Sequence, residues 1–230
     1  MTQHFWIAGT DTDVGKTLVT TYFMRYFQAK GENVIPYKPV QTGIIVENSK
    51  KYYGDTEFYQ SFSEEVLVEE HLNSYSFKEP ASPHYAAMLE GIVIEEEVIL
   101  QHIKQLKSLY DWVICEGAGG LYVPLNEQRN YHFLHLIKQS QLPVVLVART
   151  KLGTINHTLL SIEVLKMNDI PIAGVVFNAF EGTELESNNI RTIGQITDLP
   201  SLVFPKLKNL SDFKNIRLED TEFFERLLHI

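Results

Sequence analysis

The residues GTDTDVGKT, Gly9 to Thr17, stand between a short apolar run and a helical pattern. A loop of glycine and small polar residues lets successive backbone N–H groups turn toward one anion, and the helix that follows adds the positive end of its dipole. Lys16 can then reach terminal phosphates, and Thr17 can coordinate Mg²⁺. The segment therefore predicts a nucleotide site.

The loop departs from the standard phosphate-binding motif by one position. GxxxxGKS or GxxxxGKT needs glycine at position 10, where this chain has Thr10, and the glycine stands one residue earlier. An ordinary turn between strand and helix, with a lysine in the first helical turn, is the alternative. The order of strand, glycine, polar loop, GKT and amphipathic helix favours the nucleotide site.

Short apolar runs alternate with helical patterns along the chain. Runs rich in β-branched and aromatic residues are typical of buried parallel strands, here Phe5 to Ala8, Val34 to Tyr37, Trp112 to Cys115, Val144 to Ala148 and Ile172 to Phe177. Helices are expected over Lys16 to Gln28 and Ile155 to Met167. We predict the α/β class, a P-loop NTPase-like layered fold with a mostly parallel central sheet and helices on both faces. Residues 1–230 are expected to form a single P-loop α/β domain.

Three segments give finer expectations. The first helix has a stripe of apolar residues that we assign to the core, namely Val19, Tyr22, Phe23, Tyr26 and Phe27. Ile44 to Pro83 is acidic and lacks a long periodic run, so we expect it to be partly irregular and to lie over the strand ends, where substrates bind. Glu181 to Asn189 is expected to be a polar loop before a final αβα segment.

Composition restricts the partners. A formal net charge of −9 argues against a nucleic-acid partner, because binding to a phosphate backbone depends on clustered Lys and Arg. The longest strongly apolar stretch, Leu142 to Ala148, is far shorter than the roughly 20 residues of a membrane helix. The single cysteine, Cys115, cannot form an internal disulfide, and no signal-peptide pattern is present. We expect small-molecule partners, no membrane partner and a cytoplasmic location.

Two strand ends have charged side chains where ligands bind. Lys38, in YKPVQTG, ends the second strand, and Glu116, in DWVICEGAGG, precedes a Gly-rich turn. Open α/β sheets bind ligands beyond the carboxyl ends of their strands, and we expect the strands before Lys16 and Lys38 to be neighbours, so that two lysines flank one phosphate. Glu116 would hold Mg²⁺. Exposure to solvent is the alternative for both Lys38 and Glu116.

Other candidates are weaker. Asp55 is a third carboxylate, although nothing local distinguishes it from the other acids of its segment. His157 is interpreted as a surface or core-edge residue, and Cys115 as a small core residue. No His/Cys cluster has metal-ligand spacing, and neither a GxSxG elbow nor a nucleophilic triad is indicated.

Six motifs resemble, in their order, those of the dethiobiotin synthetase family: GTDTDVGKT, YKPVQTG, GD with Asp55, EPASPH, EGAGG and KLGTINH. They span residues 9 to 157, the strand ending at Asn178 extends the match, and the last fifty residues are poorly diagnostic. The family's phosphate loop also has its glycine one place early, so the departure at Thr10 supports the resemblance. Thr42 stands where serine is also usual, and Ala81 where the family often has threonine.

The resemblance implies a homodimeric ligase of biotin biosynthesis that depends on ATP and Mg²⁺. Such a cyclo-ligase forms C–N bonds and closes the ureido ring of dethiobiotin from 7,8-diaminopelargonate and CO₂. In the family, a carbamate forms on the diamine, ATP phosphorylates it to a carbamic-phosphoric anhydride, and the second amine closes the ring, releasing ADP and phosphate. Each step moves negative charge, so lysines and Mg²⁺ are expected to dominate the site.

The resemblance also implies roles for single residues. Lys16 and Lys38 would be catalytic, Thr17, Asp55 and Glu116 would hold Mg²⁺, and Thr42 would bind substrate. Nucleotide contacts are implied for Asp13, Val14, Gly15, Lys16, Thr17, Leu18, Asp55, Glu116, Gly117, Ala118, Gly119, Asn178, Phe204, Pro205 and Lys206, of which Asn178 reads the adenine edge and the last three border the base. The helix start at Gly153, Thr154 and Ile155 would meet the substrate carboxylate from the dimer side, which makes the active site shared between subunits.

Two other functions fit the same fold. A partner-switching ATPase that resembles chromosome-partitioning and division-site proteins is disfavoured, because such proteins usually have a second lysine early in the loop, where this chain has Thr10, Asp11 and Thr12. The acidic balance also speaks against a membrane or DNA attachment surface. Another small-molecule ATP ligase is disfavoured by EPASPH and KLGTINH through the resemblance alone.

Overall fold

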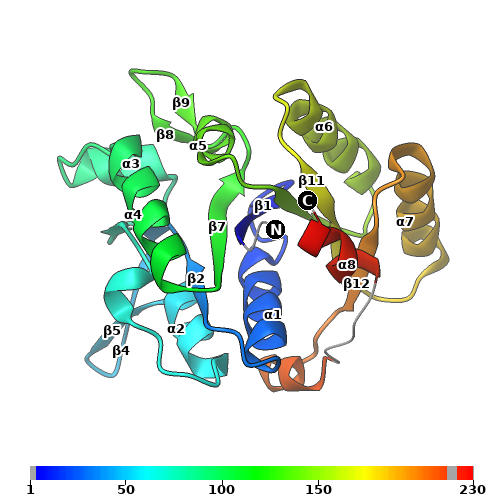
Figure 1. Cartoon of the computed structure of the whole chain (residues 1–230), viewed down its shortest axis with the longest axis horizontal. Coiled ribbons are helices and arrows are strands. Elements are labelled where there is room, and N and C mark those ends of the chain that lie inside the picture. Colours follow the sequence, from blue (N-terminus) through cyan, green and yellow to red (C-terminus); the bar gives the residue numbers. More distant parts are fainter. Residues whose placement is uncertain (1–3, 217–221, 230) are drawn as a thin grey trace.

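The computed structural model describes residues 4–216 and 222–229. Its centre is a six-stranded sheet in the order β12-β11-β10-β1-β7-β2, with every neighbouring pair parallel (Figure 1). The strands are β1 (His4–Gly9), β2 (Val34–Tyr37), β7 (Trp112–Gly120), β10 (Val144–Arg149), β11 (Ile172–Phe180) and β12 (Ser201–Pro205). The parallel sheet predicted from the apolar runs is confirmed.

Helices cover both faces of this sheet. They are α1 (Lys16–Gln28), α2 (Gly54–Phe62), α3 (Pro83–Leu89), α4 (Glu96–Leu109), α5 (Phe133–Ser140), α6 (Thr154–Met167), α7 (Glu184–Thr197) and α8 (Glu222–His229). Phe5 of β1 packs on Phe23 of α1, with ring centroids 5.3 Å apart, and the next residue, Trp6, packs on Phe133 of α5 at 6.4 Å. Because successive strand side chains point to opposite faces, α1 and α5 lie on opposite sides of the sheet.

The aromatic stripe of α1 lies in the core, as predicted. All five of its residues are buried. Phe27 stacks on Trp112 with centroids 3.8 Å apart, and Tyr26 stacks on Phe224 of α8 at 3.7 Å. Burying one large apolar side chain contributes roughly 1.5–3 kcal/mol. The stripe therefore holds the phosphate-loop helix firmly between the sheet and α8.

Residues 44–83 are more regular than expected. They contain the antiparallel hairpin of β4 (Ile44–Glu47) and β5 (Lys50–Tyr53), then α2, the 3-10 helix η1 (Glu69–His71) and β6 (Tyr75–Phe77), which pairs with β3 (Val40–Thr42). Asn48 and Ser49 adopt φ of 49° and 67°. Two left-handed residues form the tight turn that matches strand twist, which is why so short a segment closes a hairpin.

The prediction that β1 and β2 are neighbouring strands is wrong. β7 lies between them and pairs with both. The apolar run of β7 suits an interior strand, with Val113, Ile114 and Cys115 fully buried. The strand also continues through the Gly-rich segment to Gly120 instead of ending in a turn at Glu116. As a result, the carboxylate of Glu116 stands between the two lysine-bearing loops.

The predicted loop from Glu181 to Asn189 is also too long. Helix α7 begins at Glu184, because Thr183 and Glu186 form a capping box: Glu186 N donates to Thr183 Oγ1 at 3.3 Å, and Thr183 N donates to Glu186 Oε2 at 3.1 Å. This pattern of threonine followed three residues later by glutamate starts helices. It is a local signal that overrides the polar composition.

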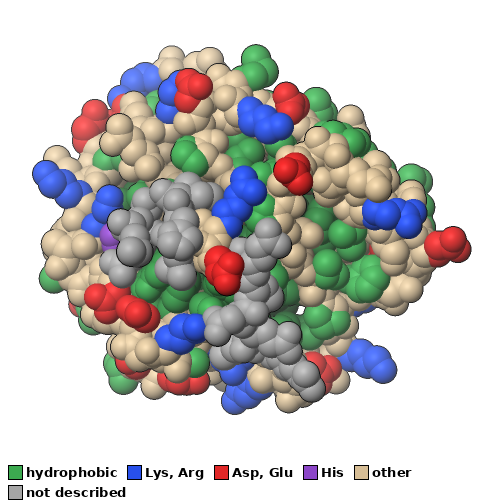
Figure 2. All heavy atoms as spheres, turned by 45° about the vertical axis from the view of Figure 1, so that its right-hand side comes forward, with side chains coloured by type: hydrophobic (Ala, Val, Ile, Leu, Met, Phe, Trp, Pro, Cys, Tyr) green, Lys and Arg blue, Asp and Glu red, His purple; other side chains and the backbone are tan. Residues whose placement is uncertain are grey.

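The remaining short elements are β8 (Pro124–Asn126), β9 (Tyr131–His132) and the 3-10 helix η2 (Leu210–Asn215). Within the described residues, no helix combines the length and the apolar character that crossing a bilayer requires. On the face drawn in Figure 2, Lys and Arg side chains alternate with Asp and Glu and gather in no continuous basic patch.

Candidate active site

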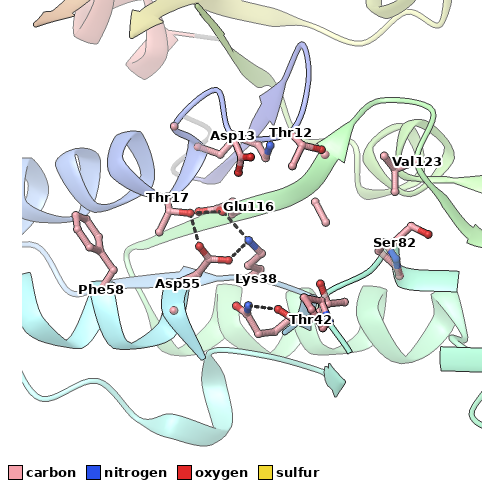
Figure 3. A pocket seen from close by; sticks show the side chains of 18 of the residues that line it. Thr12, Asp13, Thr17, Lys38, Thr42, Asp55, Phe58, Ser82, Glu116 and Val123 are labelled. Carbon is pink, nitrogen blue, oxygen red and sulfur yellow. Dashed lines mark hydrogen bonds and ion pairs between the residues drawn. The ribbon is translucent and has the colours of Figure 1, made fainter. Parts of the chain in front are cut away.

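A cavity of about 740 Å³ lies beyond the carboxyl ends of β1, β7 and β2 (Figure 3). It is formed by the phosphate loop and α1, the segment after β2, the start of α2 and the Gly-rich end of β7. Most residues predicted for nucleotide and catalytic roles line it: Asp13, Gly15, Lys16, Thr17, Leu18, Lys38, Thr42, Asp55, Glu116, Ala118 and Gly119. The sequence motifs, although far apart in the chain, therefore meet at one place.

The glycines of the loop are required by close contacts. A Cβ on Gly9 would lie 2.8 Å from Asp11 O and 3.0 Å from the Cδ and Nζ atoms of Lys16. Lys16 folds back over Gly9, and its Nζ donates to Asp11 O at 2.9 Å. Gly15 has φ of 97°, and a Cβ there would lie 1.9 Å from Asn178 Nδ2. The early position of the first glycine thus leaves room for the lysine side chain.

Lys38 is held between two carboxylates at the floor of the cavity (Figure 3). Its Nζ donates to Glu116 Oε1 at 2.9 Å and forms an ion pair with Asp55 Oδ2. The backbone on either side is fixed, since Lys38 N donates to Leu72 O and Asn73 Nδ2 donates to Lys38 O, both at 2.8 Å. A buried cation is thereby presented from a rigid strand end.

The burial of Lys38 and Glu116 rules out the alternative that they are exposed to solvent. Lys38 is 8% exposed and Glu116 is fully buried, so the hypothesis that either is a solvent-exposed strand-end residue is wrong. Buried charges persist only when they are paired, and these two pair with each other. Asp55, which no local feature distinguished, joins them from the first turn of α2. The outcome is one cation shared by two anions.

The pKa values follow from this pairing. Burial alone would lower the pKa of Lys38, but Glu116 and Asp55 outweigh it and raise the pKa. Burial would raise the pKa of Asp55, and the ammonium of Lys38 outweighs it and lowers the pKa. Burial lowers the pKa of Lys16 to about 8, opposed mainly by Glu116. Lys38 is therefore the cation that stays charged at any physiological pH.

Three oxygen-bearing side chains converge beside Lys38. Thr17 Oγ1 lies 2.6 Å from Asp55 Oδ1 and 2.9 Å from Glu116 Oε1, so one hydroxyl serves two acceptors. Mg²⁺ prefers oxygen ligands, and it is usually bound by one or two carboxylates together with substrate phosphates. Because the phosphate loop lines the same cavity, this donor set fits a magnesium ion.

Tyr59 was not predicted from the sequence. It is fully buried in α2, and its hydroxyl donates to Glu116 Oε2 at 2.5 Å. Tyr59 stands four residues after Asp55, hence on the same helix face, which is the one signal that could have indicated it. Gln41, Phe58, Ser82 and Leu210 also line the cavity without having been predicted.

Several predicted residues do not line this cavity. Asn178 stands behind the loop, where its Nδ2 donates to Val14 O at 3.0 Å. Gly117 lies in β7, and Phe204, Pro205 and Lys206 lie in and after β12. Gly153 and Ile155 line a second cavity of about 460 Å³, and Thr154 beside them is buried and donates to Arg149 O at 2.5 Å.

Comparison with known proteins assigns the family. The model of the family described as "AAA domain" matches residues 3–214. The "ATP-dependent dethiobiotin synthetase BioD" of Lysinibacillus sphaericus (strain C3-41) is 53% identical over 98% of this chain and 96% of its own length, and the protein of that name from Bacillus subtilis (strain 168) is 36% identical over 90% and 89%. The chain belongs to the ATP-dependent dethiobiotin synthetase family. The resemblance found in six motifs is thereby confirmed.

Solved structures agree on the fold. The septum site-determining protein MinD from Pyrococcus horikoshii OT3, complexed with Mg-ADP, matches with a TM-score of 0.59 over 98% of this chain and 95% of its own, at 14% identity. A ParA family ATPase from Chlorobium tepidum TLS matches with a TM-score of 0.58 over the whole of both chains, at 11% identity. At this identity the likeness shows the fold alone. It is the P-loop NTPase fold, which the sequence predicted for this chain.

Proposed function

We infer that the chain is an ATP-dependent dethiobiotin synthetase, a ligase of biotin biosynthesis that forms dethiobiotin from 7,8-diaminopelargonate, CO₂ and ATP. Family membership supports this inference, and one geometric observation supports it most. The buried ammonium of Lys38, held by Asp55 and Glu116, shares a cavity with the phosphate loop. A reaction between a carbamate and a terminal phosphate brings two anions together, and a fixed cation between them lowers the repulsion.

The phosphate loop would bind the polyphosphate. Residues of the loop and of the start of α1 line the cavity, and Lys16 would leave Asp11 O for the transferred phosphoryl group. Thr17, Asp55 and Glu116 would hold Mg²⁺, which supplies charge neutralisation on the phosphate oxygens when bound. Tyr59 would orient Glu116 through the bond to Oε2. Gly117, Ala118 and Gly119 would border the nucleotide.

The bonds made and broken balance without any covalent enzyme intermediate. A carbamate oxygen on the diamine attacks the γ-phosphorus, and ADP leaves. The second amine then attacks the carbamate carbon, and phosphate leaves with that carbamate oxygen, which closes the ureido ring. Lys38 would stabilise the negative charge on the carbamate and on the transferring phosphoryl group, and Thr42, which lines the cavity, would hydrogen-bond the substrate.

The adenine would lie on the side of β11 and β12. Asn178 Nδ2 donates to Val14 O, so the side-chain oxygen and the second N–H of Asn178 would bind the edge of the base. Phe204, Pro205 and Lys206 would border the ring. Phe204 is buried against Tyr22 of α1, with ring centroids 4.6 Å apart, which fixes this border relative to the phosphate loop.

We further propose a homodimer with a shared active site in the cytoplasm. Gly153, Thr154 and Ile155 do not line the main cavity, and Gly153 and Ile155 line the second one. The backbone amides that these residues supply at the start of α6 would therefore meet the substrate carboxylate in the partner subunit. Leu152 is 87% exposed and Leu160 59% exposed beside them, as expected of an apolar face that a second copy covers.

The assay that tests the function measures ADP release with Mg-ATP and bicarbonate, with and without 7,8-diaminopelargonate, and identifies the product by mass. Turnover that requires the diamine and yields dethiobiotin is expected. Turnover that ignores the diamine but responds to a protein or lipid would instead indicate a partner-switching ATPase, the activity class that the fold's likeness to MinD and ParA proteins keeps open.

A further inference from the structure

Glu186 is a buried carboxylate outside the main cavity, with more hydrogen bonds than its helix cap needs. It is 2% exposed. Its Oε2 accepts from Thr183 N at 3.1 Å, Thr183 Oγ1 at 2.9 Å and Glu181 N at 3.1 Å. Its Oε1 accepts from Thr150 Oγ1 at 2.5 Å. The carboxylate thus satisfies donors from two different loops.

The capping box of α7 explains only one of these loops. Thr183 and Glu181 belong to the loop between β11 and α7, where capping contacts are expected. Thr150 belongs to the loop between β10 and α6, a different strand end. A second α7 residue, Asn189, is 4% exposed and donates from Nδ2 to Thr150 O at 2.9 Å. Helix α7 therefore holds both the side chain and the backbone of Thr150.

The two joined loops serve different substrates under the proposed function, on which this inference rests. Thr150 lies three residues before Gly153, where the segment proposed to receive the diamine's carboxylate begins. Arg149 beside Thr150 donates from Nη2 to Asp13 O in the phosphate loop at 2.9 Å. On the other side, the carboxylate of Glu181 binds Lys206 at the proposed base border, Nζ to Oε1 2.5 Å.

Glu186 stays ionised in this position. Burial would raise its pKa, but the hydrogen bonds from Thr150 and Thr183 outweigh burial and lower the pKa to about 2. A charged acceptor binds its donors more strongly than a neutral one. At neutral pH the two loops are therefore joined by a carboxylate rather than by a neutral acid.

We propose that Glu186 is a positioning residue that, through Thr150, fixes the start of α6 against the nucleotide side, and so sets the affinity for the diamine. It touches neither substrate. A merely structural role would lower stability without a selective effect on one substrate, whereas a positioning role raises KM for the diamine and leaves kcat and KM for ATP nearly unchanged.

Three variants separate these roles. Thr150→Val removes the side-chain bond to Glu186 and leaves the capping box and the bond from Asn189 to Thr150 O, and Thr150→Ser keeps the hydroxyl. We expect Thr150→Val to raise KM for the diamine about tenfold, the effect of losing one bond to a charged group, with kcat within about twofold. Thr150→Ser restores the KM. Thr183→Ala removes the Thr183 hydroxyl from the cap and from Glu186 Oε2 but keeps the bond from Thr150 to Oε1, so it should lower Tm and leave that KM within about twofold of the wild type.

Glu186→Gln tests whether the two residues act as one. The double variant Thr150→Val/Glu186→Gln should raise KM by less than the product of the two single effects, because both changes act on the same bond. The proposal is overturned if Thr150→Val leaves KM for the diamine unchanged, if Thr150→Ser is as impaired as Thr150→Val, or if Thr183→Ala raises that KM equally. These comparisons hold even where Glu186→Gln fails to fold.

Hydrogen exchange distinguishes this inference from the function on which it rests. Exchange at residues 149–155 should become faster in Thr150→Val and return to the wild-type rate in Thr150→Ser, whatever reaction the enzyme performs. Dethiobiotin missing from the wild-type assay would refute the function, while exchange would still report on the joint. Unchanged exchange together with normal product formation would refute the joint alone.

Discussion

At the scale of residues, the site is one cation between two anions. Lys38 is paired with Asp55 and Glu116 in a cavity that the phosphate loop also lines. Removing one partner of a buried ion pair leaves an uncompensated charge, which is why these three side chains depend on one another. The motifs alone predicted Lys38 and Glu116, but their pairing depends on β7 lying between β1 and β2, which no local pattern states.

Lys38→Ala should lose about 10²- to 10³-fold in kcat, the usual effect of removing one charge-stabilising donor. The nucleotide should still bind, because the loop contacts remain. Steady-state kinetics with a fluorescent ADP titration measure both quantities. A loss below about tenfold in a folded variant would refute the role given to Lys38.

Tyr59→Phe should weaken the apparent Mg²⁺ affinity by about 10- to 100-fold, as loss of an outer-shell hydrogen bond commonly does. The ring stays in place, so only the bond to Glu116 Oε2 is lost. Turnover is titrated with Mg²⁺ at fixed ATP. Tyr52→Phe, which removes an exposed tyrosine hydroxyl bonded to Glu47, is the matched control and should titrate as the wild type does. Equal titration curves for Tyr59→Phe and the wild type would contradict the role.

At the scale of elements, strands and the first helix were predictable and the connections were less so. Apolar runs predicted five of the six strands of the main sheet, because full burial demands continuous hydrophobic residues. The edge strand β12 is mostly exposed and has no such run. The start of α7 was missed, because the local capping signal of Thr183 and Glu186 competes with a polar composition that favours a loop. Strand order was missed because it depends on packing between distant segments rather than on any single run.

Glu186 makes the stability of the α7 start depend on pH. Burial would raise its pKa, but the hydrogen bonds from Thr150 and Thr183 outweigh burial and lower the pKa to about 2, from the usual 4.5 of a glutamate. A lowered pKa means that its contribution is complete above about pH 4.5 and is lost as the pH falls toward 2. Glu186→Gln should therefore be less stable than the wild type at pH 7, and the difference should shrink with acidification. Urea unfolding at pH 7, 5, 4 and 3 measures it, and a difference that grows in acid would contradict this assignment.

At the scale of the whole molecule, the family and the fold predicted from the sequence are confirmed, whereas the single-domain organisation and the dimer stay predictions. Six motifs sufficed for the family because each fixes a backbone or charge requirement of one site. Gly153 and Ile155 line a cavity separate from the main one, so under the proposed function this segment would meet the substrate of a partner copy. A dimer is the simplest arrangement that brings this segment to a substrate.

Leu160→Glu should convert the dimer to monomer and lower turnover, because it places a charge in the apolar face of α6, where Leu160 is 59% exposed. Sedimentation velocity measures the oligomeric state. Leu109→Glu, at the end of α4 and 49% exposed, is the matched control and should remain dimeric. A Leu160→Glu variant that sediments as the wild type does would place the interface elsewhere.

The most direct test of the mechanism follows an oxygen atom. Bicarbonate labelled with ¹⁸O is mixed with enzyme, Mg-ATP and 7,8-diaminopelargonate in ordinary water, and the released phosphate is analysed by mass over a few turnovers. Phosphorylation of a carbamate predicts one ¹⁸O in each phosphate formed with dethiobiotin, because the attacking oxygen comes from CO₂. Phosphate free of label, released at the same rate as the product, would contradict the carbamic-phosphoric anhydride and with it the role assigned to Lys38.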